Sequence, residues 1–176
     1  MSDKLDVVGI GNAMVDAIIP SNQSEIEKHE INRDSMNLID ENLKNNLHES
    51  YSIREMAGGG SLGNSMFGIT SFGGNGSFIG KIKNDEVGIF LQKDMVREGL
   101  QFPLGFTSPD ISTGCCTIFV EEDGTRTMCT FLGAGTLIGP DDINDQHIKN
   151  HKIAYLEGYL WDNENAKKAM KKMVDI

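Results

Sequence analysis

The chain of 176 residues is long enough for one folded domain and too short for two, and 39% apolar and 24% charged residues is the composition of an ordinary globular protein. Its formal net charge of −10 argues against general binding to nucleic acid or to an anionic membrane, since both surfaces repel an acidic protein. No stretch approaches the roughly 18 apolar residues of a membrane span, and the first residues lack the long apolar core of a secretory signal. We therefore expect a cytoplasmic protein with no nucleic-acid or membrane partner.

The amino-terminal part predicts two strands and two polar segments. Residues 5–10 and 15–19 are apolar runs rich in β-branched residues, and the glycines between them favour a bend that joins two consecutive strands. Residues 24–30 and 40–48 are polar stretches that we expect as surface helices or loops, with Asp40 placed to cap the second one.

A glycine-rich segment follows at residues 57–76. Its glycines lead into apolar residues at near-helical spacing, which predicts a glycine loop that opens a buried helix. Residues 77–82 then predict a short strand, and residues 84–96 predict a helix that stops at Gly99.

The remaining chain predicts a hairpin and then a return to alternating elements. Residues 113–120 and 127–132 form the hairpin, closed by a turn at Asp123 and Gly124. A helix at 143–150, a strand at 153–156 and a helix at 163–174 follow. This order predicts a largely parallel α/β sheet, with the hairpin inserted or flanking, and it leaves the strand near Tyr155 as a sheet edge.

Neither cysteines nor histidines predict a metal site. The three cysteines, Cys115, Cys116 and Cys129, lack C-x-x-C spacing and are expected as buried free thiols. His147 and His151 are four residues apart without the glutamate of a zinc-protease motif, so we expect them on the surface of a helix.

Two glycine motifs differ from nucleotide-binding loops. Residues 9–14 begin like a dinucleotide fingerprint, but Met14 stands where the third glycine is needed and a strand follows. Residues 58–64 lack the Gly-Lys-Ser/Thr ending of a Walker loop. Glycines before a helix do allow backbone N–H groups to approach a ligand, and Asn64 and Ser65 add side-chain donors there.

Several short motifs are spread along nearly the whole chain. They are Ala57-Gly58-Gly59-Gly60 with Asn64, Gly73-Gly74, Phe78-Ile79-Gly80-Lys81, Asp85-x-x-Gly88, Gly11 to Asp16, Thr113-Gly114 and Asp123-Gly124-x-Arg126. Together they resemble the ribokinase-like (PfkB) kinases. The resemblance implies an α/β fold of the ribokinase-like type, with a partial Rossmann-like sheet, helices and a small β lid. Residues 1–176 would then form a single incomplete domain, with lid elements at approximately 12–39 and 112–132 inserted in it.

The resemblance also implies a substrate-binding set. In this family the residues that match Asp16, Gly59, Gly60 and Asn64 bind the acceptor. A carboxylate accepts hydrogen bonds from neighbouring hydroxyls while amide groups supply donors, which suits a ribose-like diol.

Other matches refine this site. Asn12 and Met14 resemble the adenosine-kinase branch, where an asparagine contacts the nucleoside and an apolar residue touches the base. Glu157 stands where the ribokinase branch has an acceptor-binding glutamate. Arg126 matches a lid arginine that approaches the transferring phosphate, a catalytic role that suits a guanidinium.

The resemblance implies an ATP-dependent phosphotransferase acting on a hydroxymethyl group of a sugar or nucleoside such as adenosine or ribose. The family's second motif, which carries the general base, matches nothing in the chain, because Thr136 follows Gly133-Ala134-Gly135 where an aspartate is required. ATP and Mg are therefore expected to bind mainly through a missing carboxy-terminal half, and the chain alone is expected to be inactive. A noncatalytic sugar- or nucleoside-binding or interaction module stays open as an alternative, as does a homodimer through the lid.

Overall fold

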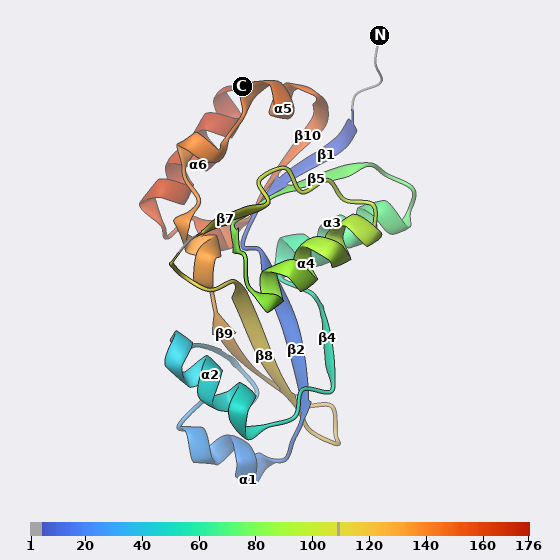
Figure 1. Cartoon of the computed structure of the whole chain (residues 1–176). Coiled ribbons are helices and arrows are strands. Elements are labelled where there is room, and N and C mark those ends of the chain that lie inside the picture. Colours follow the sequence, from blue (N-terminus) through green and yellow to red (C-terminus); the bar gives the residue numbers. More distant parts are fainter. Residues whose placement is uncertain (1–4, 109) are drawn as a thin grey trace.

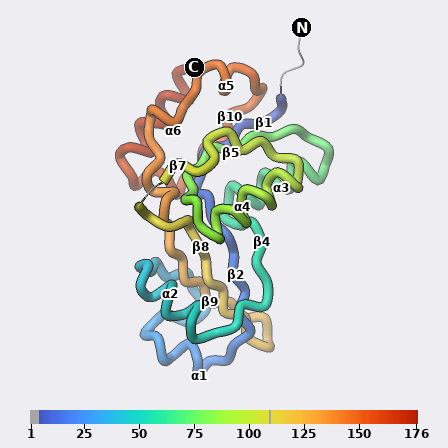
Figure 2. Tube along the Cα trace, viewed as in Figure 1, coloured from blue at the N-terminus to red at the C-terminus, as the bar shows by residue number. Residues whose placement is uncertain are grey.

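The chain folds into two parts, an α/β core and a second sheet below it that we call the lid (Figure 1). This computed structural model describes residues 5–108 and 110–176. The start of the amino-terminal segment, where no secretory signal was expected, lies outside them. The chain passes from the core to the lid between β1 and β2, returns after β4, crosses again before β8 and returns after β9 (Figure 2).

The core is a parallel sheet with helices on both faces, as the alternating pattern predicted. Its strand order is β10-β1-β5, and adjacent residues of β1 point to opposite faces. Val7 packs in an apolar cluster with residues of α3 and α4, and Val8 packs with residues of α5 and α6. The elements are β1 (Leu5–Ile10), β5 (Gly76–Ile79), β10 (His151–Leu156), α3 (Ser61–Ser71), α4 (Glu86–Arg97), α5 (Asp145–Lys149) and α6 (Glu164–Asp175).

β10 is an edge strand, which confirms the expectation for the strand near Tyr155. Within residues 5–108 and 110–176 its ladder partner is β1 alone. Ile153 in the middle of β10 is 59% exposed. An apolar side chain on an unpaired edge favours pairing with another chain.

The lid sheet has the strand order β3-β9-β8-β2-β4. β8 and β9 form the predicted antiparallel hairpin, while β2 pairs in parallel with β8 and antiparallel with β4. The two strands predicted at the start of the chain therefore exist but belong to different sheets. The elements are β2 (Met14–Pro20), β3 (Met36–Leu38), β4 (Glu55–Gly58), β8 (Gly114–Val120), β9 (Arg126–Phe131), α1 (Gln23–Ile26) and α2 (Glu41–Ser50).

The two faces of the lid sheet differ. One face packs Ile19 and Phe119 against Ile26 of α1 and Leu47 of α2. The other, which we call the open face, carries Met14, Cys116 and Ile118 with Val120, Met128 and Leu132, and no described helix joins that cluster. Asp16 lies on the open face too, because it is level with Cys116 and Thr130 in the strand ladder.

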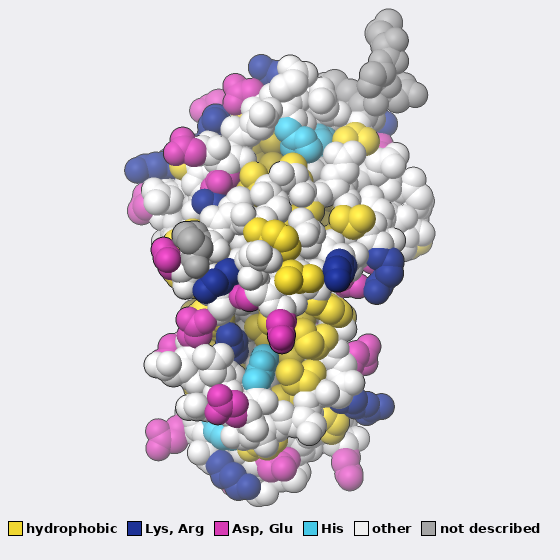
Figure 3. Space-filling model, viewed as in Figure 1, with side chains coloured by type: hydrophobic (Ala, Val, Ile, Leu, Met, Phe, Trp, Pro, Cys, Tyr) yellow, Lys and Arg dark blue, Asp and Glu magenta, His cyan; other side chains and the backbone are white. Residues whose placement is uncertain are grey.

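Apolar packing also joins the lid to the core. Val15 of β2 and Met56 of β4 belong to the same cluster as Leu62 of α3 and Leu91 of α4. Figure 3 shows hydrophobic side chains gathered where the two parts meet. Movement of the lid relative to the core would have to rearrange this shared cluster.

The predicted helix cap at Asp40 is confirmed, Asp85 caps α4 in the same way, and one prediction is wrong. The side chains of Asp40 and Asp85 accept hydrogen bonds from the backbone N–H groups of Leu43 and Gly88. His151, expected on a helix surface, is instead buried at the first position of β10. The short elements not yet named are β6 (Ile82–Lys83), β7 (Phe106–Ser108), η1 (Glu27–His29), η2 (Gly133–Leu137), η3 (Pro140–Asp142) and η4 (Gly158–Leu160).

None of the helices among the described residues combines the length and the apolar character needed to cross a bilayer.

Candidate acceptor site

Asp16 and the glycine loop lie against each other at the junction of lid and core. β2 and β4 pair so that Asp16 is opposite Ala57, and the Gly59 N–H donates to the Met14 carbonyl at 3.0 Å. A Cβ on Gly59 would lie 2.2 Å from Cγ of Asp16 and 2.3 and 2.5 Å from its two carboxylate oxygens. Residue 59 must therefore be glycine for the carboxylate to occupy this position.

Gly60 turns the chain into α3. Its φ of 79° falls in the region that favours glycine, and a Cβ there would lie 3.1 Å from Cγ of Met14. Gly60 is the N-cap of α3 and gives the helix no side-chain cap, while the Asn64 N–H donates to the Gly60 carbonyl at 3.0 Å. The exposed side chain of Asn64 thus lies in the first turn of α3, one helical turn from the loop that touches Asp16.

Burial changes the electrostatics of Asp16. Burial raises the pKa of its carboxyl above the ordinary 3.8, and a backbone contact with Gly60 partly offsets the rise. Among the ion pairs of the described residues, none includes Asp16. Its lone pairs can therefore accept hydrogen bonds from a ligand's hydroxyl groups.

Asn12 and Glu157 lie beneath this loop and bind each other. One Glu157 oxygen, Oε2, accepts from the Asn12 backbone N–H at 2.7 Å and from Asn12 Nδ2 at 3.1 Å. The other, Oε1, accepts from the backbone N–H of Leu62 at 2.9 Å. Both side chains are buried, so the structure brings these two predicted residues together with the glycine loop.

A second buried carboxylate holds the opposite side of the loop. Oδ2 of Asp94, on α4, accepts from the Gly58 N–H at 2.8 Å, and its other oxygen pairs with Arg97. The sequence pattern did not single out Asp94, because a polar residue in a helix usually lies on the solvent face.

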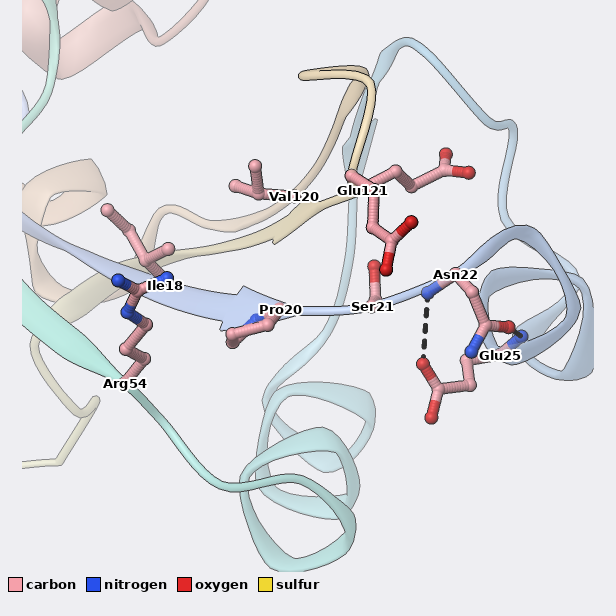
Figure 4. A pocket seen from close by; sticks show the side chains of 9 residues that line it. Ile18, Pro20, Ser21, Asn22, Glu25, Arg54, Val120 and Glu121 are labelled. Carbon is pink, nitrogen blue, oxygen red and sulfur yellow. Dashed lines mark hydrogen bonds between the residues drawn. The ribbon is translucent and has the colours of Figure 1, made fainter.

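A separate hollow lies at the far tip of the lid. It has a volume of about 540 Å³ and is lined by residues such as Ile18, Arg54 and Glu121. Figure 4 shows these side chains around the end of β2, with Asn22 donating to Glu25 at 3.0 Å beside them. No predicted site residue lines this hollow, so it is not the predicted acceptor site.

The chain matches a known protein family over almost its whole length. The model of the pfkB family of carbohydrate kinases matches residues 5–176. The chain belongs to this family. Its predicted ribokinase-like fold is confirmed by its likeness to solved kinase structures.

Solved structures place this pfkB-family chain near nucleoside and sugar kinases. It is 37% identical to adenosine kinase from Sinorhizobium meliloti, with a TM-score of 0.89 over 98% of this chain and 53% of that one. It is 33% identical to a probable sugar kinase from Rhizobium etli CFN 42, with a TM-score of 0.88 over 98% of this chain and 52% of that one. An uncharacterized sugar kinase of Archaeoglobus fulgidus is 28% identical over 54% of this chain and 38% of its own length. The chain therefore spans about half the length of the solved structures it matches, and less of the curated relative.

Arg126 lies apart from the other predicted residues of this pfkB-family site. It is exposed at the first position of β9, opposite Val120, whereas Thr130 and Cys116 are level with Asp16. Four strand residues separate Arg126 from that level, which corresponds to about 13 Å along the strand. In this conformation the structure does not bring Arg126 and Asp16 together.

The residues that the structure describes include no preformed cluster of metal-binding side chains. In the ranges 5–108 and 110–176, no group of three or more His, Cys, Asp or Glu side chains is placed to hold a metal ion. The segment Gly133–Leu137, which superficially resembles the family's anion-binding motif, is a short 3-10 helix with its first three residues buried. This segment therefore does not present an open helix start to the phosphates of a nucleotide.

Two exposed aromatic residues that the sequence pattern did not single out lie just beyond the end of β10. Tyr159 lies in η4, two residues after Glu157, and Trp161 follows η4; they are 73% and 50% exposed. Lys167 Nζ lies 5.4 Å from the centre of the Trp161 ring. The sequence could have drawn attention to them, because they come soon after a polar residue at the end of a predicted strand. Ligands of α/β sheets bind at the carboxyl ends of the strands.

Proposed function

We propose that the complete protein transfers the γ-phosphate of ATP to a hydroxymethyl group of a sugar or nucleoside, and that this chain supplies the acceptor site. One observation carries the proposal: the Asp16 carboxylate lies on the Gly59–Gly60 loop, which opens the helix that carries Asn64. Asp16 can accept from two neighbouring hydroxyls while the Asn64 amide and the loop N–H groups donate. Those are the groups that a ribose-like diol needs.

A nucleoside is the acceptor that we favour over a free sugar. Exposed Leu38 of β3 and the partly buried members of the open-face cluster offer apolar surface, and Tyr159, 73% exposed, offers an aromatic ring just beyond the end of β10. Such surfaces suit a flat base by burial and stacking. The likeness to an adenosine kinase supports this choice, while the likeness to a probable sugar kinase keeps sugars as the second class.

ATP and Mg would bind mainly through residues beyond this chain, since the chain spans about half of its solved relatives and its described residues hold no cluster of metal-binding side chains. In that arrangement the chain positions the acceptor, and Arg126 would approach the transferred phosphate only after the lid closes. The chain alone would then bind the acceptor without phosphorylating it.

Assembly and location are part of the same proposal. A homodimer through the lid would bury Met36 and Leu38, which are 49% and 66% exposed on the edge strand β3. The acidic charge disfavours nucleic acid and membranes as partners, and we place the protein in the cytoplasm.

ATP-dependent phosphorylation of adenosine, ribose and fructose tests the proposal, measured with the complete gene product and with this chain. We expect the complete product to phosphorylate one of the three, with adenosine ahead, and this chain to phosphorylate none. The alternative, a noncatalytic binding module, predicts acceptor binding without phosphate transfer even for the complete product.

A further inference from the structure

Glu157 is buried at a point where three distant segments meet. It follows β10, is 3% exposed, and its carboxylate accepts all three of its hydrogen bonds from other parts of the chain. Asn12 lies 145 residues away in sequence and Leu62 lies 95 residues away. The carboxylate therefore ties the end of β10 to the turn after β1 and to the start of α3.

The surroundings of this carboxylate leave little room for a ligand. A Cβ on Gly11 would lie 2.6 Å from Leu62 and 3.0 Å from Glu157 Oε2, so glycine at position 11 makes room for the Leu62 side chain and lets the carboxylate approach the backbone closely. A Cβ on Gly135 would lie 3.0 Å from Asn12 Oδ1. Glu157 and Asn12 are thus enclosed by backbone.

The hydrogen bond to Leu62 matters most for the site. Leu62 is the second residue of α3, and the N–H groups of a helix's first turn have no partner within the helix. Gly60, which precedes the helix, has no side chain that could cap it. Glu157 supplies a negatively charged acceptor at this end, where it interacts favourably with the helix dipole.

The geometry points to Glu157 as a positioning residue, which does not touch the acceptor but fixes Asn12 and the start of α3 so that the Gly59–Gly60 loop stays against Asp16. This inference rests on the proposed function, since it assigns to Glu157 a role in the same acceptor site. Two measurements distinguish this positioning role from direct binding of the acceptor by Glu157.

The first measurement needs no acceptor. Amide hydrogen exchange by NMR is compared between the wild-type chain and Glu157→Gln, with exposed Glu49→Gln as a matched control. A glutamine offers one acceptor oxygen and places an NH2 group toward N–H donors. We expect exchange at Leu62 and Asn12 to speed up at least about 10-fold in Glu157→Gln, with β8 unchanged and with no change in the control.

This measurement stays decisive if Glu157→Gln fails to fold. In the wild-type chain the Leu62 amide should be protected even though it belongs to the first helical turn. Rapid exchange at Leu62 in the folded wild type, or unchanged exchange there in a folded Glu157→Gln variant, would overturn the inference.

The second measurement uses the complete gene product and compares the affinity for adenosine, 2′-deoxyadenosine and 3′-deoxyadenosine. A positioning residue weakens all three by the same factor, expected at about 10-fold or more, so the losses from the substitution and from each missing hydroxyl multiply. If Glu157 instead bound a hydroxyl, one deoxy analogue would bind wild type and Glu157→Gln equally, which contradicts the inference. If the wild type bound none of the three compounds, the proposed nucleoside acceptor would be contradicted. The exchange measurement would still decide the role of Glu157.

Discussion

The carboxylate of Asp16 lies over the α-carbon of Gly59, so close that a Cβ there would stand 2.2 Å from its Cγ. Alanine at position 59 must therefore displace the carboxylate or the loop. We expect Gly59→Ala to weaken acceptor binding by about 100-fold or more, because it moves a charged hydrogen-bond acceptor out of place. Isothermal titration calorimetry with the preferred acceptor measures the loss.

A matched control lies in the next helix. Gly68 is inside α3, and a Cβ on it would have no heavy atom within 4 Å. Gly68→Ala should leave affinity unchanged and raise the free energy of unfolding by about 0.5–1 kcal/mol, since alanine is the better helix former. Equal affinity losses in the two variants would show that Gly59 has no special relation to Asp16.

Asp16 itself should lower the stability of the folded chain at neutral pH. The pKa of Asp16 is higher in the folded chain than its unfolded value of 3.8. The stability that the protonated carboxyl contributes is therefore fully present below pH 3.8 and is lost as the pH rises through the folded pKa. The permanently neutral Asp16→Asn should therefore be more stable than wild type at pH 7, by about 0.5–1 kcal/mol, while the two converge below pH 3.8. Thermal melts at both pH values check this, and a less stable variant at pH 7 would contradict it.

The three cysteines should be unreactive in the folded protein. Burial raises the pKa of Cys115 and Cys129 to about 12 and that of Cys116 to about 11. At pH 8 the reactive thiolate form is therefore scarce, and all three side chains are buried. We expect 5,5′-dithiobis(2-nitrobenzoic acid) to react with no thiol in the native state and with three in denaturant. Rapid reaction of one thiol in the native state would contradict the packing of the lid.

Two histidines should make the chain less stable in mild acid. Burial lowers the pKa of His48 and His147, with further lowering from Lys44 and His151 respectively. The unfolded chain, with its histidine value of 6.5, then takes up protons first, so stability is full above pH 6.5 and falls as the pH drops below it. Both rings are only partly buried, so we expect a fall in melting temperature of about 2 °C between pH 7.5 and 5.5. The double variant His48→Gln/His147→Gln should lack this part of the pH dependence, and an unchanged pH profile would refute the assignment.

The exposed edge of β10 should make this chain prone to aggregation when expressed alone. Ile153→Lys places a charge at the centre of the edge, a change that disfavours pairing between edges. We expect the variant to stay monomeric at higher concentration than wild type in sedimentation velocity. Lys152→Gln is not a suitable control because Lys152 pairs with Asp6, so exposed Val174→Lys on α6 serves instead. A sharp, cooperative melt of a monomeric wild type would count against the expectation.

Local signals in the sequence were enough for the elements with strong patterns. The β-branched runs around Val7 and Val15, the turn at Gly124, and the cap Asp40 each follow from chemistry within a few residues. The short strands β3, β4, β6 and β7 carry no such pattern, and partners far along the chain hold them in place. β4, with the sequence Glu-Met-Ala-Gly, is a strand because it pairs with β2.

In the candidate site, too, local features were predicted and contacts between distant residues were not. The loop of Gly59 and Gly60 at the start of a helix was predicted from its glycines, and Asp16 was assigned to the same site by the resemblance to ribokinase-like kinases. The bonds that Glu157 and Asp94 make to the loop were not predicted, since each joins residues far apart in sequence. His151 was assigned to a helix surface because its i, i+4 spacing from His147 imitates a helical face, whereas the chain changes from α5 to β10 between them.

Affinity of the complete gene product for adenosine, ribose and fructose, with and without Asp16→Asn, tests the acceptor site most directly. We expect the wild type to bind one of these compounds and Asp16→Asn to bind it about 100-fold more weakly while remaining folded, since the charged acceptor of its hydroxyl groups is lost. Equal binding by a folded Asp16→Asn variant would contradict the site described above.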